Sequence, residues 1–542
     1  MGRMTSFKLA VASLAVVPAP ALADWRVAET KNFIYYSEAD DAELTATVQE
    51  LEKFDTLIRA FTNNRKPVNP AKLVIFEVDG LDDVRNTLPY PAGSVAGYYT
   101  TTSTGPFLVT FRKDIVTSKN SIMKASNQPI RLGPEVRQHE YLHHYMYQYF
   151  NTNYPVWYSE GFAEYYGTMA FPEENVAEVG HAPIGRVDAI RFGEWLHVRD
   201  LLKAKSYADV DNISALYAQG WLLTHMGAQN PVRGKQLQQY LAGVVAGEDY
   251  EKAAEAAFGD LDELNKELRK HSRGFNSMRL SLKPLNLGPV DIRTLSPAES
   301  ALMHYKIRLK SGMKVSDLPA MTRNAAQILA REPGSVMGLE VVAQLQNMAG
   351  EHTDASATAD RLLALDPGNV TGMTEKGKAL LGVLDTASTA QQWADGRAWL
   401  EKAAAASATA TDPRVALFQS YEKQGVMPAV EAQNRLVEAF QLIPQNDDIR
   451  YLLARDFEQR GMIDDAIGII KPAAFGAFDG DEGEKRKRQR ALAKAADRYT
   501  NISNYESPID MLKRLEGLKA AQASTGEAVE TTAVSETAPA AL

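Results

Sequence analysis

The pattern of hydrophobic and polar residues divides the chain into a mixed first half and a helical second half. In the first half, the apolar runs 32–36 and 72–78 are rich in β-branched and aromatic residues, which predicts strands. Residues 42–61 repeat Leu, Val and Phe at helical spacing. Residues 95–100 and 107–111 flank a Thr/Ser/Gly-rich turn, and we expect them to pair as a hairpin.

From about residue 298 onward, Ala-rich amphipathic stretches alternate with breaks that contain proline. The first two of these prolines, Pro333 and Pro367, are 34 residues apart, which is the tetratricopeptide period. The segments 364–369 and 453–467 resemble parts of such repeats, whereas the later spacings are irregular. Stacked helix pairs present a concave surface on which we expect a protein partner or a substrate segment. The alternative is a helical domain without a repeat.

The main group of candidate metal-binding and catalytic residues lies on a predicted helix. This helix begins near Pro134, and no further Pro or Gly follows until Pro155. Positions four apart on a helix share a face, so His139 and His143 present two imidazoles close enough to hold one metal ion. Glu140 lies one step round the helix, where it can reach a water molecule bound to that metal. This is the signature of a zinc peptidase.

Two imidazoles leave a tetrahedral zinc incomplete, because catalytic sites use three protein ligands and one water. After a predicted turn at residues 151–155, a second helix is expected over residues 156–170, folding back on the first. It carries Glu160 and Glu164, two carboxylates four residues apart that repel each other on an ordinary helix. A divalent cation beside the two carboxylates would turn this unfavourable interaction into a favourable one, so the pair indicates a site that binds a metal.

The HEYLH motif at 139–143, followed by WYSEGFAEY at 157–165, resembles the gluzincin metallopeptidases, the clan of thermolysin and the zinc aminopeptidases. The resemblance implies that Glu160 is the third ligand of a Zn²⁺ ion, beside the two histidines. It also implies that Glu164 orients a zinc-binding imidazole and raises its basicity.

In that clan an edge strand beside the zinc binds extended peptide by adding a strand to the sheet. Residues 95–99 or 107–111 are the candidates for this role here, and an ordinary structural hairpin is the alternative.

A further candidate lies downstream, in the apolar segment 214–226. Tyr217 to Gly220 resembles the Y-x-x-G element of the zinc aminopeptidases, whose Tyr donates a hydrogen bond to the oxyanion. His225 is the alternative donor, since thermolysin-type enzymes use a His for this task. A tyrosine on an apolar helix is also commonly a packing residue. The G-x-M-E-N motif of the aminopeptidases is not found, which favours an endopeptidase over an exopeptidase.

Residues 1–23 are expected to be a cleavable signal peptide, with Arg3 and Lys8 before a short apolar run and a cleavage site after Ala23. The run is too short to span a membrane, and no other stretch approaches a span. The chain has no cysteine, which excludes thiol ligands and disulfides. A net charge of −9 and a pI near 5.7 argue against nucleic acid as a partner. We therefore expect a periplasmic or secreted protein.

The expected fold is α+β, with a thermolysin-like metallopeptidase domain followed by an all-α, tetratricopeptide-like solenoid of helix pairs. The expected division of the chain is a signal peptide at 1–23, a mixed α/β part of the catalytic domain at 24–130, its helical zinc-binding part at 131–275, a linker at 276–297, the helical domain at 298–520 and a disordered tail at 521–542.

The function expected from these features is hydrolysis of peptide bonds in a peptide or protein substrate. Zn²⁺ held by His139, His143 and Glu160 activates a water, and Glu140 acts as the general base. Tyr217, or else His225, supports the oxyanion. The alternative is a catalytically idle zinc protein, or a metal-free one, that acts as an envelope scaffold or chaperone through its helical repeats.

Overall fold

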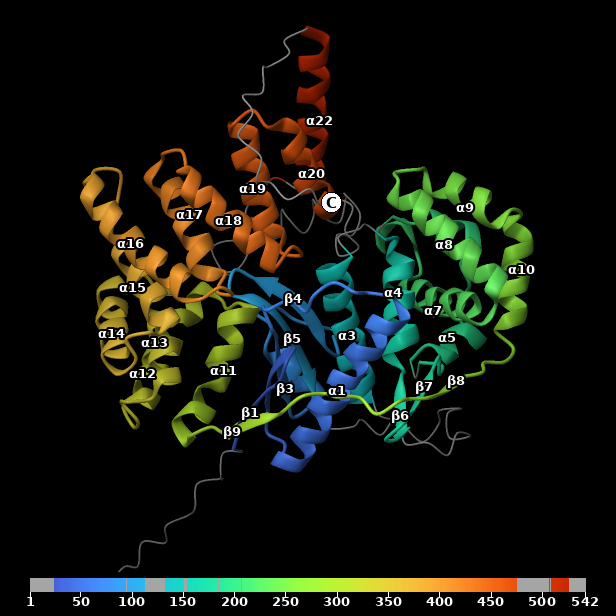
Figure 1. Ribbon diagram of the computed structural model, residues 1–542, viewed down its shortest axis with the longest axis horizontal. Coiled ribbons are helices and arrows are strands. Elements are labelled where there is room, and N and C mark those ends of the chain that lie inside the picture. Colours follow the sequence, from blue (N-terminus) through green and yellow to red (C-terminus); the bar gives the residue numbers. More distant parts are fainter. Residues whose placement is uncertain are drawn as a thin grey trace, which may run out of the picture.

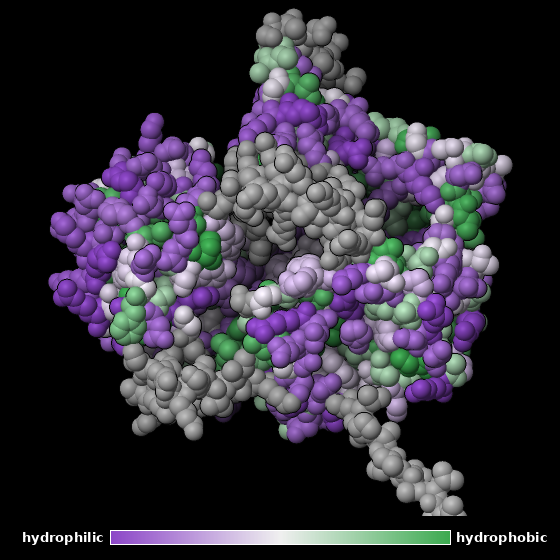
Figure 2. Space-filling model, turned by 180° about the vertical axis from the view of Figure 1, so that it is seen from behind, coloured by the Kyte–Doolittle hydropathy of each residue, from purple (hydrophilic) through white to green (hydrophobic). Residues whose placement is uncertain are grey.

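The computed structural model of the protein describes residues 24–93, 95–112, 132–150, 154–183, 185–205, 207–474, 506 and 508–525. The predicted signal peptide, most of the predicted turn at 151–155 and most of the predicted tail lie outside these residues. In the described part the chain is mostly helical, with a six-stranded sheet near the centre of the molecule and a three-stranded sheet to one side of it (Figure 1). Seen from behind, its surface is mainly hydrophilic, with hydrophobic residues gathered in small separate groups (Figure 2). None of the helices described is long and apolar enough to cross a membrane.

A six-stranded sheet in the order β4-β5-β3-β2-β1-β9 forms the core of the first half. β2, β3 and β5 run parallel to one another, and the outer strands pair antiparallel. The hairpin predicted from residues 95–100 and 107–111 is confirmed, because β4 pairs antiparallel with β5. The strands are β1 (Arg26–Glu29), β2 (Phe33–Ser37), β3 (Leu73–Val78), β4 (Tyr98–Thr102), β5 (Gly105–Phe111) and β9 (Asp291–Thr294).

Side chains that alternate along the strands are buried on both faces of this sheet. On β3, Ile75 belongs to the core formed with α1 (Asp41–Phe61) and α3 (Leu132–Tyr149). Its neighbour Phe76 belongs to a second core, which contains Met303 and Ile307 of the helix α11 (Pro297–Ser311). Helices therefore cover both faces.

The structure differs from the expected domain division at the predicted linker, residues 276–297. Two strands form there, β9 of the large sheet and β8 (Met278–Ser281), which pairs with β7 (Val176–Val179). The next helix, α11 (Pro297–Ser311), packs on the large sheet with α2 (Leu81–Asn86). β8 and β9 are short edge strands with mostly exposed side chains, so they lack the buried alternation that reveals a strand in a sequence.

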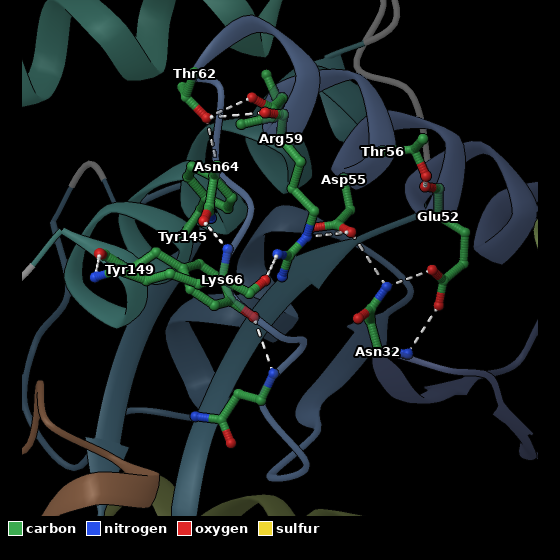
Figure 3. A network of polar contacts seen from close by, with 12 residues as sticks. Asn32, Glu52, Asp55, Thr56, Arg59, Thr62, Asn64, Lys66, Tyr145 and Tyr149 are labelled. Atoms are coloured by element: carbon green, nitrogen blue, oxygen red, sulfur yellow. Dashed lines mark hydrogen bonds and ion pairs between the residues drawn. The ribbon is translucent and has the colours of Figure 1, made fainter. Parts of the chain in front are cut away.

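Polar contacts fix α3 against α1 (Figure 3). The Tyr141 hydroxyl donates to the Asp55 carboxylate at 2.5 Å, and Arg59 donates to the same group at 3.0 Å. One turn further along α3, the Tyr145 hydroxyl lies 2.6 Å from that of Thr62. Residues two apart on a helix point in roughly opposite directions, so these contacts turn the histidine face of α3 away from α1.

Opposite that face lies a group of helices that completes the first half. α4 packs against both α3 and α7. The elements are α4 (Val156–Gly167), β6 (Ala170–Glu173), β7, α5 (Val187–Phe192), α6 (Val198–Lys203), the 3-10 turn η2 (Tyr207–Asp209), α7 (Ile213–Gln229), α8 (Pro231–Val245), α9 (Tyr250–Phe258) and α10 (Leu261–His271).

The crossing of α4 and α7 depends on two glycines. A Cβ at Gly161 would collide with the backbone carbonyl of Gly220, and a Cβ at Gly220 would lie 2.5 Å from the carbonyl oxygen of Trp157. The helix backbones thus approach more closely than any larger residue permits. This contact sets the positions of two site residues. Glu160 directly precedes Gly161 on α4, and Tyr217 lies one turn before Gly220 on α7.

Helix pairs continue to the end of the described chain, each packing on the next. α12 and α14 begin at residues 318 and 352, and α13 and α15 at 336 and 370, so both pairs repeat after 34 residues. A longer loop before α16, together with the greater length of α16 itself, lengthens the following repeat. The helices are α12 (Leu318–Leu329), α13 (Val336–Met348), α14 (His352–Leu365), α15 (Val370–Gly382), α16 (Ala390–Ala406), α17 (Asp412–Gln424), α18 (Val430–Leu442), α19 (Asp447–Gln459), α20 (Ile463–Ala474) and α22 (Pro508–Thr525). α22 ends at Thr525 and so extends into the segment from 521 that was expected to be disordered.

We predict that Gly161→Ala lowers the free energy of unfolding by about 1–3 kcal/mol, because the added methyl group forces α4 and α7 apart. Urea unfolding measures this change. Gly468→Ala in α20 is the matched control, since its Cβ meets nothing within 4 Å and alanine favours a helix. Equal stability of the two variants would contradict the role given to the glycine contact.

Candidate metal centre

α3 and α4 bring together the three residues predicted as metal ligands. The Nε2 atoms of His139 and His143 are 3.0 Å apart, and Glu160 Oε2 lies 3.3 Å from the first and 3.6 Å from the second. Glu160 and His143 are buried, whereas the side chain of His139 is 17% exposed, so the group can be reached from solvent. Among the described residues, this is the cluster of His, Asp and Glu whose ligand atoms converge on one point.

The donor set fits a zinc ion. Ligand atoms around a tetrahedral zinc, each about 2.0–2.1 Å from the metal, lie roughly 3.3 Å from one another, and the three distances are close to this value. Glu160 Oε2 is buried and accepts no hydrogen bond of ordinary geometry in the described structure, although buried carboxylate oxygens normally do. A cation coordinated at this point would satisfy that oxygen.

The electrostatics of the cluster also favour a positive charge. Burial alone would raise the pKa of Glu160, but the charges and close polar contacts of His143 and His139 outweigh it and hold the pKa well below its usual range. Burial likewise opposes protonation of His139, yet the polar contact with Glu160 and the charges of Glu164, Glu160 and Glu140 raise its pKa to about 9. The carboxylates thus attract a cation to this point.

Glu164 lies beside His139, beyond hydrogen-bonding distance. Its Oε1 is 3.9 Å from His139 Nδ1, the ring nitrogen that faces away from the ligand cluster. The same oxygen accepts from Arg186 at 2.7 and 2.8 Å. Arg186 therefore holds the carboxylate beside the imidazole, and the guanidinium also stacks over the Tyr217 ring at 4.4 Å.

Glu140 faces the sheet. Its carboxylate accepts the backbone N–H of Tyr99, in β4, at 2.9 Å. β4 is the outer strand of the sheet, whereas β5 lies between β4 and β3. Of the two candidate edge segments, the one at 107–111 is therefore wrong, because both sides of β5 are paired. Gly97 allows this approach, since a Cβ there would lie 2.5 Å from the Val136 side chain on α3.

Tyr217 lies beside the cluster. Its ring stacks on that of His139 with centroids 6.4 Å apart. Burial raises the pKa of the Tyr217 hydroxyl well above its ordinary value, and the charges of Glu160 and Glu140 add to the effect, although Tyr207 and Arg186 oppose it. The phenol therefore stays protonated and can donate a hydrogen bond.

His225, the alternative oxyanion donor, lies elsewhere, which corrects that expectation. It follows Tyr217 by eight residues on α7, about 12 Å along the helix. Its Nδ1 lies 2.8 Å from His271 Nε2, and its Nε2 lies 3.2 Å from the Asn276 carbonyl oxygen. It is fully buried, so its contacts tie α7 to the end of α10.

The sequence reasoning missed two residues at this site, Tyr207 and Arg186. The Tyr207 hydroxyl donates to Glu160 Oε1 and lies 3.5 Å from the hydroxyl of Tyr217. Tyr207 stands on a 3-10 turn, and Arg186 just before α5, in irregular segments without a motif. Nothing in their spacing relates them to the ligand helices.

Comparison with known proteins gives likenesses of fold over part of the chain. A thermophilic TPR protein of Thermus thermophilus, TTC0263, has 18% identity and a TM-score of 0.27, and the match covers 36% of this chain and 92% of that one. MamA has 18% identity and a TM-score of 0.25, with coverage of 32% and 92%. No family model and no curated protein matches the chain.

We predict that acid destabilises the fold through His225. Burial and the nearby His271 lower the pKa of His225 to about 4, below the value of about 6.5 in an unfolded chain. The folded state therefore binds this proton less readily, so the stabilisation is complete above about pH 6.5 and is lost as the pH falls towards 4. Urea unfolding at pH 7 and pH 5 should show a larger loss for the wild type than for His225→Asn. Equal losses would contradict the assignment.

Proposed function

We propose that the protein is a zinc-dependent peptidase that hydrolyses peptide bonds in an extended peptide or protein segment. The observation that carries the proposal is the convergence of His139, His143 and Glu160, with Glu140 one residue along and turned towards an edge strand. A metal site built only for structure has no need of a carboxylate base and an open strand beside it.

His139, His143 and Glu160 would hold the metal, with their outer atoms kept in place by neighbours. Glu164 faces the second ring nitrogen of His139, and Tyr207 donates to the far oxygen of Glu160. Contacts of this kind fix the orientation of the ligands, and the carboxylate of Glu164 also raises the basicity of the His139 imidazole. When bound, zinc lowers the pKa of water and polarises the scissile carbonyl group.

Glu140 is the general base in this proposal. Its carboxylate takes a proton from the attacking water and later delivers it to the leaving amine. The Tyr99 N–H keeps the carboxylate turned towards β4, where the substrate backbone would lie.

Tyr217 donates to the oxygen that gains negative charge as the carbonyl is attacked. Its hydroxyl stays protonated because burial raises its pKa, and two neighbouring residues restrict the movement of the ring. The Arg186 guanidinium lies over it, and the Tyr207 ring stacks on it at 6.3 Å. A donor held in place before the reaction costs no reorganisation when charge appears.

The substrate would add a strand to the open edge of β4, with backbone hydrogen bonds supplying affinity. The predicted signal peptide at 1–23 makes the periplasm or the exterior the place of action. The helix pairs offer a surface for a protein partner. The rival function, an idle zinc-binding or metal-free scaffold, is separated from this one by the two experiments below.

We predict about one zinc ion per chain in the purified protein, and its loss in His143→Ala, because two of the three ligands cannot complete the site. Elemental analysis after dialysis against zinc measures it. His304→Ala, an exposed histidine on α11, is the control and should keep the metal. Absence of zinc from the wild type would leave the metal-free scaffold.

Glu140→Gln should keep its zinc and lose hydrolysis by about 10²–10⁴-fold, the usual contribution of a general base. The measurement is cleavage of a peptide library, with products identified by mass spectrometry. Full activity in this variant would remove Glu140 from the mechanism. A wild type that binds zinc and cleaves nothing would instead support the idle scaffold.

A further inference from the structure

The helical domain reaches back to the strand beside the metal centre. The loop between α18 and α19 contacts both walls of this region, with Asn446 donating to the Thr101 hydroxyl at 3.2 Å and Gln445 donating to Gln148, on α3, at 2.8 Å. Gln148 and Asn69 in turn donate to the carbonyl of Leu442. Figure 1 shows α18 and α19 beside the end of β4.

The start of α17 holds the tip of the β4–β5 hairpin. The Thr411 hydroxyl donates to the carbonyl oxygen of Ser103 at 2.5 Å, and the Ser103 hydroxyl donates to Asp412 at 3.1 Å. Lys378, on α15, pairs with the same aspartate at 2.6 Å. The hairpin tip is thus fixed in the helical domain by charge-supported contacts.

These contacts limit the open edge of β4. The Tyr99 N–H points away from β5, since it donates to Glu140. Outward-pointing groups recur every second residue on a strand, so the backbone groups of Thr101 point the same way and Ser103 is the next in line. The Ser103 carbonyl already accepts from Thr411. A peptide paired with β4 therefore cannot extend past Ser103, because the helical domain blocks it there.

Two independent lengths give the distance from the general base to the helical domain, which is the space available to a bound peptide. From Tyr99 to Ser103 the strand advances about 13 Å, at roughly 3.3 Å per residue. From Glu140 to Gln148, where the α18–α19 loop stands, α3 advances about 12 Å. Both lengths hold about four extended residues between the general base and the wall.

We propose that the helical domain makes the enzyme trim peptides near one end, with at most about four residues held between the scissile bond and the wall formed by residues 442–446 and 411–412. Gln445 is the specificity-determining residue of this wall, and the buried Asn446 holds the loop against Thr101. The proposal rests on the peptidase function and replaces the expectation of an endopeptidase, which came only from a missing motif.

The test compares a linear 20-residue peptide with the same sequence closed head to tail, and products are identified by mass spectrometry. We expect the wild type to cut the linear peptide within about four residues of one end and to leave the cyclic peptide intact, because a ring has no end to place against the wall. Internal cuts in the linear peptide, or cleavage of the ring at a similar rate, would overturn the proposal while the peptidase function stands. Cleavage of neither peptide would overturn both.

A double variant tests the wall itself. Gln445→Gly with Asn446→Gly removes both side chains, and glycine is tolerated at the start of a helix such as α19. Cuts should move further from the peptide end, with a change in KM larger than that in kcat. Asn434→Ala, an exposed position on α18, is the matched control and should cut as the wild type does. An unchanged cutting position in the double variant would remove these residues from the wall.

A second readout does not require turnover. In Glu140→Gln, a bound linear peptide should slow hydrogen exchange of the backbone amides in residues 98–102, because it covers the edge of β4. The cyclic peptide should give no such protection. Equal protection by both peptides would overturn the proposed wall.

Discussion

The buried carboxylate of Glu160 is the constraint on which the rest of the site depends. A charged group removed from water is tolerated only where other groups compensate it. Here the compensation comes from two imidazoles of α3 and the phenol of Tyr207, which lie in different parts of the chain. α3, α4 and the turn at η2 must therefore keep their relative positions. The close approach of α4 to α7 at Gly161 serves the same end, since it fixes the helix that carries the carboxylate.

The part of the site that the sequence predicted is the part that one helical period defines. His139 and His143 needed only a continuous α3, and Glu160 and Glu164 needed only a second helix with a recognisable motif. Arg186 and Tyr207 could not be found in this way, because they come from irregular segments whose approach to α4 depends on the packing of the whole first half. His225 shows the opposite error. A histidine is a suitable oxyanion donor, but His225 lies eight residues beyond Tyr217 on α7 and is therefore far from the metal ligands.

The sequence likewise predicted part of the fold and missed part of it. Helical spacing of apolar residues identified α1, whereas β-branched and aromatic content identified β3, and a polar turn between two apolar runs identified the β4–β5 hairpin. Each of these elements contributes buried side chains to a core. Periodicity also marks a helix at α11, yet it shows only that a face is buried and not what covers it. The partner turned out to be the sheet, so the expected boundary at 297 falls between two elements of one core. The short strand β9 had no buried face to reveal it.

The pairing of β1 with β9 joins the first described element to one that lies far along the chain, Arg26 opposite Thr294. A ribosome adding about 5–20 residues per second needs roughly 10–50 s to pass from one strand to the other. Throughout that interval β1 lacks its outer neighbour, and the face of the sheet that contains Phe76 and Phe107 lacks α11. Contacts between such distant segments also close slowly in a free chain. The sheet is therefore a late product of folding, completed only after the helices of the metal centre have been synthesised.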